Sequence, residues 1–247
     1  HRLLGIFSGQ IDSKGEIPAM NEALIRSAML LGDKAMERLA ASHVAVFGLG
    51  GVGSFCAEAL ARSGIGALTL VDDDTVAESN LNRQLIALHS TLGRPKAEVM
   101  AERIRDIAPQ CRLTVLPCRY TPETRDGFFA APLDYAADCI DSVACKTDLI
   151  ATAISREIPI LSAMGTGNKL DPSRLVLTDL AKTSVCPLAR VMRRELKKHG
   201  IVHHQVIYST ELPIRVPGAT VPGSVAWVPS CAGLMMAGHI VRELAKQ

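Results

Sequence analysis

The first place in this sequence where a ligand could approach the backbone is a cluster of glycines. The apolar run 43–47 leads directly into Gly48, Gly50, Gly51 and Gly53, which precede an alanine-rich segment. Glycine lets a chain turn sharply and lets a phosphate approach without meeting a Cβ, and the N-terminus of a following helix offers free N–H groups. The pattern predicts a nucleotide phosphate site. The alternative is that these glycines serve only tight packing of a strand against a helix.

Charged residues downstream indicate which nucleotide is bound. Asp72 ends the next apolar run, where a carboxylate can accept hydrogen bonds from ribose hydroxyls. Arg83 offers a planar fork for phosphate oxygens and Lys96 a compact charge, so both could converge on a triphosphate beside the glycines. A nicotinamide dinucleotide needs no such pair of cations. The alternative is that Arg83 forms ion pairs with the aspartates and that Lys96 is a solvated residue at a helix start.

Short apolar runs alternate with amphipathic segments, which is typical of a mainly parallel sheet flanked by helices. We predict strands at 43–47, 67–71, 112–116, 135–140, 158–161, 175–178 and 206–208. We predict helices at about 24–41, 52–63, 95–108, 145–156, 187–199 and 231–246. The fold class is therefore α/β with a Rossmann-like sheet, and ligands are expected at the C-terminal edge of the strands.

The composition favours a folded cytoplasmic protein. Of the 247 residues, 48% are hydrophobic and 21% are charged, which excludes a disordered chain, and the net charge of +2 excludes a surface that is basic throughout. The seven cysteines are scattered and form no C-x-x-C pair, which favours reduced thiols and excludes a zinc site of that spacing. Prolines and glycines interrupt the uncharged run 216–241, so we predict a loop and a buried helix there, with no transmembrane segment.

Several motifs resemble those of the adenylating superfamily that includes ubiquitin-activating enzymes and sulfur-carrier adenylyltransferases. They are Gly-x-Gly-Gly-Val-Gly-Ser from Gly48, Asp-x-Asp-x-Val-x-x-Ser-Asn-Leu-x-Arg-Gln from Asp72, Gly-x-x-Lys ending at Lys96, and Asp-x-x-Asp-Ser from Asp138. Within this superfamily, Thr-Asp-Leu-Ala-Lys-Thr at 178–183, Ser-Thr-Glu at 209–211 and Ser-Cys-Ala at 230–232 resemble the tRNA threonylcarbamoyladenosine dehydratase branch. The resemblance spans about residues 24–244, and the missing cysteine pairs separate the sequence from sulfur-carrier adenylyltransferases, which commonly carry them.

The resemblance implies a ubiquitin-activating-enzyme-like adenylating fold over residues 21–247, a single domain with a C-terminal subdomain. Residues 1–20 are expected to be a flexible leader or an expression remnant, without the pattern of a secretory signal. ATP and Mg²⁺ are the implied cofactors, and a monovalent cation could assist. The implied nucleotide-binding residues are the four glycines, Asp72, Asp74, Asn80, Arg83, Gln84, Lys96 and Asp141.

The resemblance also assigns roles within that set. Arg83 and Lys96 would stabilise charge on the α-phosphate, and Asp141 would orient Mg²⁺ or the nucleotide. The alternative for Asp141 is that it caps the helix predicted from residue 145. Arg26 stands where the superfamily inserts an arginine across a homodimer interface into the partner's ATP site, although an exposed helical arginine is the simpler reading. Cys231 stands where relatives have been linked to sulfur transfer, which implies a cysteine desulfurase or sulfur acceptor as a partner, although a small residue buried in alanine-rich packing is the simpler reading.

The implied reaction activates a carboxylate as its adenylate and then closes a ring on tRNA threonylcarbamoyladenosine next to the anticodon, with loss of water. The nearest alternative is an adenylyltransferase that activates the C-terminus of a sulfur-carrier or ubiquitin-like protein. A dinucleotide-dependent oxidoreductase and a non-catalytic scaffold for a cysteine desulfurase are more distant alternatives.

A tRNA substrate requires a basic surface, and one segment supplies it. Between residues 182 and 199 six cations stand against the single anion Glu195, whereas the whole chain carries a net charge of only +2. Apolar residues at helical spacing place the cations on the opposite face, where they could follow phosphates. The candidate tRNA-binding residues are Lys182, Arg190, Arg193, Arg194, Lys197 and Lys198, and no DNA partner is expected. The alternative is a solvated helix face.

Overall fold

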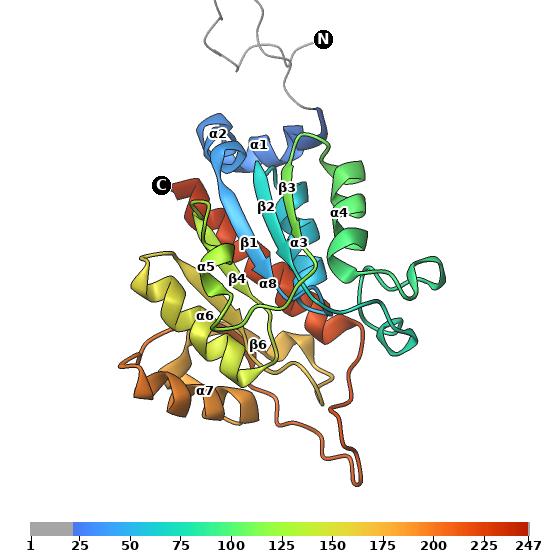
Figure 1. Cartoon of the computed structure of the whole chain (residues 1–247), viewed down its shortest axis with the longest axis vertical. Coiled ribbons are helices and arrows are strands. Elements are labelled where there is room, and N and C mark those ends of the chain that lie inside the picture. The colour runs from blue at the N-terminus through green and yellow to red at the C-terminus, as the bar shows by residue number, and fades with distance from the viewer. Residues whose placement is uncertain (1–21, 247) are drawn as a thin grey trace, which may run out of the picture.

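The computed structural model describes residues 22–246 (Figure 1), so the expectation for residues 1–20 lies outside the described residues. The sheet has seven strands in the order β3-β2-β1-β4-β5-β7-β6. All neighbouring strands pair in parallel except β6, which runs antiparallel to β7 at one edge. The predicted α/β class is confirmed. The strands are β1 (His43–Phe47), β2 (Ala67–Val71), β3 (Arg112–Leu116), β4 (Tyr135–Asp138), β5 (Ile160–Ala163), β6 (Leu175–Asp179) and β7 (Gln205–Ser209).

Helices cover both faces of this sheet. The α-helices are α1 (Ile25–Leu31), α2 (Asp33–Ala41), α3 (Gly53–Arg62), α4 (Lys96–Ile107), α5 (Arg125–Phe128), α6 (Val143–Ser155), α7 (Pro187–Lys198) and α8 (Trp227–Lys246). Short 3₁₀ helices η1 to η5 span Glu22–Leu24, Glu78–Asn80, His89–Thr91, Pro172–Arg174 and Leu180–Lys182. No helix within residues 22–246 is both long and apolar enough to cross a membrane.

Several boundaries differ from the sequence prediction. The strand β4 ends at Asp138 instead of 140, β5 spans 160–163 instead of 158–161, and the short helix α5 was not predicted. The helix predicted over 24–41 is two helices, because Gly32 between them has a φ of +83° that ends α1. The last helix begins at Trp227, four residues before its predicted start, since Pro229 is tolerated in a first turn where no intrahelical N–H is needed. The helix α6 begins at Val143 instead of 145.

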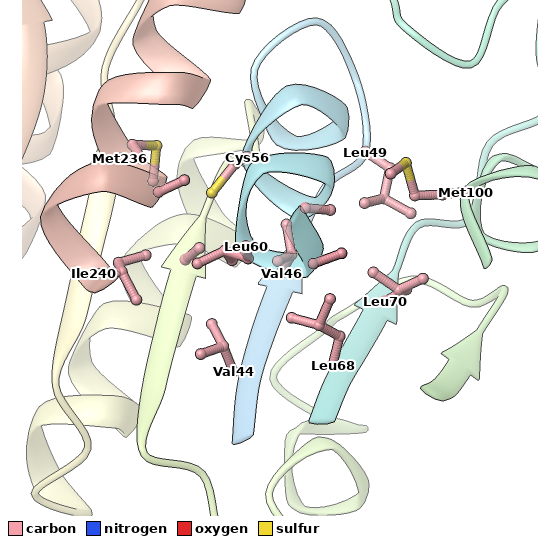
Figure 2. Close-up of a cluster of buried hydrophobic side chains, with 14 of the residues drawn as sticks. Val44, Val46, Leu49, Cys56, Leu60, Leu68, Leu70, Met100, Met236 and Ile240 are labelled. Atoms are coloured by element: carbon pink, nitrogen blue, oxygen red, sulfur yellow. The ribbon is translucent and has the colours of Figure 1, made fainter. Parts of the chain in front are cut away.

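Two apolar clusters hold the layers together. Alternate residues of β1 point to opposite faces, so Val44 and Val46 belong to one cluster and Ala45 and Phe47 to the other. The first cluster joins the sheet to α3, α4 and α8, and Figure 2 shows Leu60 of α3, Met100 of α4 and Ile240 of α8 around Val44 and Val46. The second joins it to α5, α6 and α7. This packing fixes the C-terminal ends of the parallel strands at one edge.

Candidate active site

A cleft of about 680 Å³ lies at the C-terminal edge of β1, β2, β4 and β5. Ten of the predicted nucleotide residues line it: Gly48, Gly50, Gly51, Asp72, Asp74, Asn80, Arg83, Gln84, Lys96 and Asp141. The structure therefore brings together residues that are up to 93 positions apart in the chain, from Gly48 to Asp141. Gly53 and Arg26 are not among the lining residues.

The glycines of the loop between β1 and α3 have different physical roles. Gly48 has a φ of +87°, and a Cβ on it would lie 2.8 Å from the Cys139 carbonyl oxygen. A Cβ on Gly53 would lie 1.7 Å from the Gly48 carbonyl oxygen. The fold itself therefore requires glycine at both positions. At Gly50 a Cβ would meet only the Gln84 amide at 3.6 Å, which is an ordinary contact, so the fold leaves this position open to the cleft.

Asp72 ties the end of β2 to the glycine loop. Its carboxylate accepts hydrogen bonds from the backbone N–H of Leu49 at 2.5 Å and of Asp74 at 2.9 Å. Burial raises the pKa of Asp72, and this effect outweighs the two N–H groups and the nearby Lys96, which lower it. These two N–H groups fix the orientation of the carboxylate in the cleft wall.

Lys96 and Arg83, the two cations predicted to bind phosphates, have different surroundings. Lys96 is only 4% exposed, and its Nζ lies 2.7 Å from the Asp74 carboxylate, so it is not a solvated residue at a helix start. Arg83 donates from Nη1 to the Ser79 carbonyl at 2.9 Å and to Asn82 Oδ1 at 2.8 Å. Within the described chain it forms no ion pair with the aspartates, so the alternative roles for both cations are wrong.

Asn80 and Gln84 follow on the same turn. Asn80 is buried and its Oδ1 accepts from the backbone N–H of Ala77 at 3.0 Å, which fixes the 3₁₀ turn η2. Gln84 is 8% exposed, and its Oε1 is buried with no hydrogen-bond partner among residues 22–246. An unpartnered buried amide oxygen is costly unless a ligand donates to it. The other end of the amide, Nε2, lies beside the glycine loop in the cleft wall, 3.6 Å from where a Cβ on Gly50 would lie.

Asp141 is exposed on the opposite wall of the cleft. The residue before α6 is Ser142, and no side-chain cap hydrogen bond is made there, so Asp141 does not cap the helix. Below it, the carboxylate of Asp138 and the Nζ of Lys146 form a fully buried ion pair at 2.9 Å. The Nζ of Lys146 also donates to the Ile140 carbonyl at 2.9 Å, which holds the turn that carries Asp141.

The ion pair was not predicted from the sequence. Its only signal is a lysine within an otherwise apolar helix face, and no spacing rule connects Lys146 to Asp138.

The profile of the ThiF family matches residues 24–247. The chain belongs to the ThiF family. It is 44% identical over 238 residues to the tRNA threonylcarbamoyladenosine dehydratase of Bacillus subtilis, which covers 90% of this chain and 94% of that protein.

Solved structures place the same fold around nucleotides. The ThiF-family chain superposes on the Escherichia coli tRNA N6-threonylcarbamoyladenosine dehydratase TcdA in complex with ATP with a TM-score of 0.85, at 40% identity, over 91% of this chain and 94% of that one. The complex of the same E. coli protein with AMP gives a TM-score of 0.85 at 40% identity, over 90% of this chain and 95% of that one.

The basic segment of this ThiF-family chain lies mainly on α7, but its six cations are not equivalent. Arg193 turns inward and donates to the Thr183 carbonyl at 2.9 Å, while Arg194 and Lys198 pair with Glu195. The remaining three are exposed and form no ion pair within residues 22–246: Lys182, Arg190 and Lys197.

Arg26 lies on α1, away from the cleft of its own chain. The arrowhead of β1 points away from α1 and α2 in Figure 1, so α1 lies at the opposite edge of the sheet from the cleft. Arg26 is exposed, and beside it Met29 and Leu30 are 72% and 89% exposed. All seven cysteines are free thiols, and Cys231 is partly buried in the first half of α8.

Proposed function

We propose that this chain is an ATP-dependent dehydratase that cyclises the threonylcarbamoyl side chain of tRNA threonylcarbamoyladenosine. The observation that carries the proposal is the 44% identity to the B. subtilis dehydratase over 94% of that protein. The cleft supports it, because the glycine loop, Arg83 and Lys96 line it together at one edge of the sheet.

The reaction begins when the substrate carboxylate attacks the α-phosphorus of ATP and pyrophosphate leaves. A nitrogen or oxygen of the same side chain then attacks the activated carbonyl carbon. AMP leaves with the former carboxylate oxygen, a proton is released, and the ring closes, so the substrate loses one water overall. The enzyme contributes positioning and charge neutralisation, and no nucleophile of the protein is required.

Each half of this chemistry has candidate residues. Arg83 and Lys96 stabilise charge on the phosphates as pyrophosphate leaves, and Asp72 accepts from the ribose. Gln84 offers its amide Nε2, which lies beside Gly50, to the bound nucleotide. Asn80 orders the turn that presents Arg83 and Gln84.

Mg²⁺ fits the donors that are present. Asp141 is an exposed carboxylate on the cleft wall, and the carboxylates of Asp72, Asp73 and Asp74 lie within 4.8 Å of one another. One or two carboxylates together with phosphate oxygens are the usual ligands of protein-bound Mg²⁺. When bound, Mg²⁺ would neutralise phosphate charge, with Asp141 as its protein ligand. A monovalent-ion requirement is tested by exchanging Na⁺ and K⁺ in the same assay.

The assembly and partners form part of the proposal. We assign Arg26 to the ATP site of a second copy in a homodimer, an assignment supported by the exposed Met29 and Leu30 beside it. The tRNA phosphates are assigned to the basic segment at Lys182 and α7. The seven free thiols support a cytoplasmic protein, and Cys231 is the candidate contact with a sulfur-handling partner.

The test is incubation with Mg²⁺-ATP and tRNA that carries threonylcarbamoyladenosine, followed by AMP quantification and nucleoside mass spectrometry. We expect one AMP for each nucleoside that loses the mass of one water. ATP binding without any change in the tRNA would contradict the proposal. Adenylation of a carrier protein with a Gly-Gly C-terminus would then favour the adenylyltransferase alternative.

A further inference from the structure

A segment far from the nucleotide motifs borders the cleft. Residues 210–226 connect β7 to α8, and in Figure 1 this orange-red segment descends below the sheet and returns to the start of α8. Pro222 and Ser224 line the cleft. We call residues 222–224 the strap. It lies close to the β5 side, because a Cβ on Gly167 would lie 2.8 Å from the Cβ of Pro222.

One asparagine fastens the strap on the β5 side. The backbone N–H of Asn168 donates to the Gly223 carbonyl at 2.7 Å, and the backbone N–H of Gly223 donates to Asn168 Oδ1 at 2.7 Å. Asn168 has a φ of +59°, a left-handed conformation that asparagine adopts more readily than most residues.

A second asparagine, Asn82, joins the strap to Arg83. Asn82 Nδ2 donates to the Ser224 carbonyl at 3.0 Å, and Asn82 Oδ1 accepts from Arg83 Nη1 at 2.8 Å. The orientation of this amide follows from its partners, because a carbonyl can only accept and a guanidinium can only donate. A carboxylate at this position could serve Arg83 but could not donate to the strap.

The contact determines which face of Arg83 stays available. The Nη1 group uses its two protons on the Ser79 carbonyl and on Asn82, so the N–H groups of Nε and Nη2 remain for phosphate oxygens. Arg83 also covers the loop, since its Cγ would lie 3.5 Å from a Cβ on Gly51. A guanidinium held on one edge loses less freedom when its other edge binds a phosphate.

We propose that Asn82 is a positioning residue that couples the strap to Arg83, so that a seated strap orients the guanidinium toward the α-phosphate. The coupling deepens the proposed dehydratase function and rests on it for the identity of the second substrate. Because Pro222 and Ser224 of the strap line the cleft, a molecule bound against them acts on Arg83 through Asn82.

The test is a double-mutant cycle of Asn82→Ala with Arg83→Ala, measured on kcat for AMP formation and on the dissociation constant for ATP. We expect Asn82→Ala to lower kcat about tenfold and to raise the dissociation constant for ATP by a smaller factor. In a protein that already carries Arg83→Ala, Asn82→Ala should lower kcat no further. Losses that multiply in the double variant would overturn the proposal, as would a wild-type kcat for Asn82→Ala.

Three further variants separate positioning from loop stability. Asn82→Asp keeps an acceptor for Arg83 and loses the donor to Ser224, so a wild-type kcat for it would overturn the role of the strap. Asn168→Ala should lower kcat in the wild-type background and have no further effect together with Asn82→Ala. The matched control is Trp227→Phe, which removes a 2.7 Å hydrogen bond from Nε1 to the Leu170 carbonyl next to the same segment.

We expect Trp227→Phe to keep the wild-type kcat. An equal loss in Trp227→Phe and Asn82→Ala would mean that general loosening of the loop is responsible. If the wild type does not modify the tRNA, the proposed function fails. The cycle on ATP affinity still decides whether Asn82 acts through Arg83, because that measurement needs no second substrate.

Discussion

The two halves of the cleft are built in different ways. The nucleotide half comes from residues 48–96. Its charged side chains are held by partners within the same segment, as Asp72 is by the backbone N–H of Leu49 and Lys96 is by the carboxylate of Asp74. The other half comes from the segment after β3, the ends of β4 and β5, the start of α7 and the strap. Its charged residues are Arg119 and Asp141, and most of its remaining lining is small or apolar, including Met164, Gly165 and Leu188. The first half therefore concentrates the charged groups that face the phosphates, and the second half surrounds the remaining space mainly with uncharged residues. This division suits a reaction in which the substrate supplies its own nucleophile.

Two glycines three residues apart give the sharpest test of the nucleotide half. Gly53→Ala places a Cβ 1.7 Å from a carbonyl oxygen, so we expect unfolding free energy to fall by more than about 4 kcal/mol, or no folded protein. Gly50→Ala meets only the Gln84 amide at 3.6 Å, so we expect a change below about 1 kcal/mol but an ATP affinity at least about tenfold weaker. Urea unfolding and calorimetric titration measure the two quantities. Equal stability losses would contradict the division of roles.

The buried ion pair gives the corresponding test of the other half. Lys146→Met leaves the Asp138 carboxylate buried without its cation, and we expect a loss of about 3–5 kcal/mol in urea unfolding. Adding Asp138→Asn removes that charge and should recover at least about 1 kcal/mol. A double variant that is no more stable than Lys146→Met alone would show that the ion pair does not hold this turn.

Arg83 and Lys96, the two cations expected to bind the phosphates, test whether the nucleotide half supplies the charge stabilisation. Arg83→Ala and Lys96→Ala should each lower AMP formation about 10²- to 10³-fold, because each removes a positive charge where negative charge develops. Lys34→Ala, on the exposed surface of α2, is the matched control and should keep wild-type activity. A loss below about tenfold in both cleft variants would place the charge stabilisation elsewhere.

The same division explains what the sequence could predict. The strands were located within a few residues and ten nucleotide residues were placed in one cleft, because the strand-glycine-helix motif and its carboxylates are local in sequence. The contacts that complete the site join distant residues, such as Asn82 with Ser224 across 142 positions and Asn168 with Gly223 across 55. No periodicity or spacing rule reports such pairs. The break at Gly32 was missed because the apolar pattern continues through it.

Acid sensitivity should arise on the β5–β7 side of the sheet. His204 contacts Ser162 Oγ at 2.7 Å, and burial, followed by the nearby Lys146, lowers its pKa to about 4, although Asp179 acts in the opposite direction. The unfolded chain binds this proton near pH 6.5 and the folded chain does not, so stability is lost as the pH falls from about 6.5 to 4. The loss is about 3 kcal/mol for this group.

The measurement is urea unfolding of the wild type and His204→Gln at pH 7, 5.5 and 4.5. We expect the variant to lose less stability on acidification, because the carboxylates that titrate in both proteins cancel in the difference. Parallel pH profiles for the two proteins would mean that His204 takes up its proton without unfolding.

The smallest expected effect concerns the surface beyond the cleft. Lys182, Arg190 and Lys197 are exposed, whereas Arg193 is committed to Thr183. Changing these three exposed cations to glutamate should raise the KM for tRNA about tenfold and flatten its salt dependence, with the affinity for ATP unchanged. The matched control changes Lys34, Arg105 and Arg112 to glutamate, which alters net charge equally on exposed residues of α2, α4 and β3. If both triple variants weaken tRNA binding alike, overall charge is responsible and α7 is not a dedicated tRNA surface.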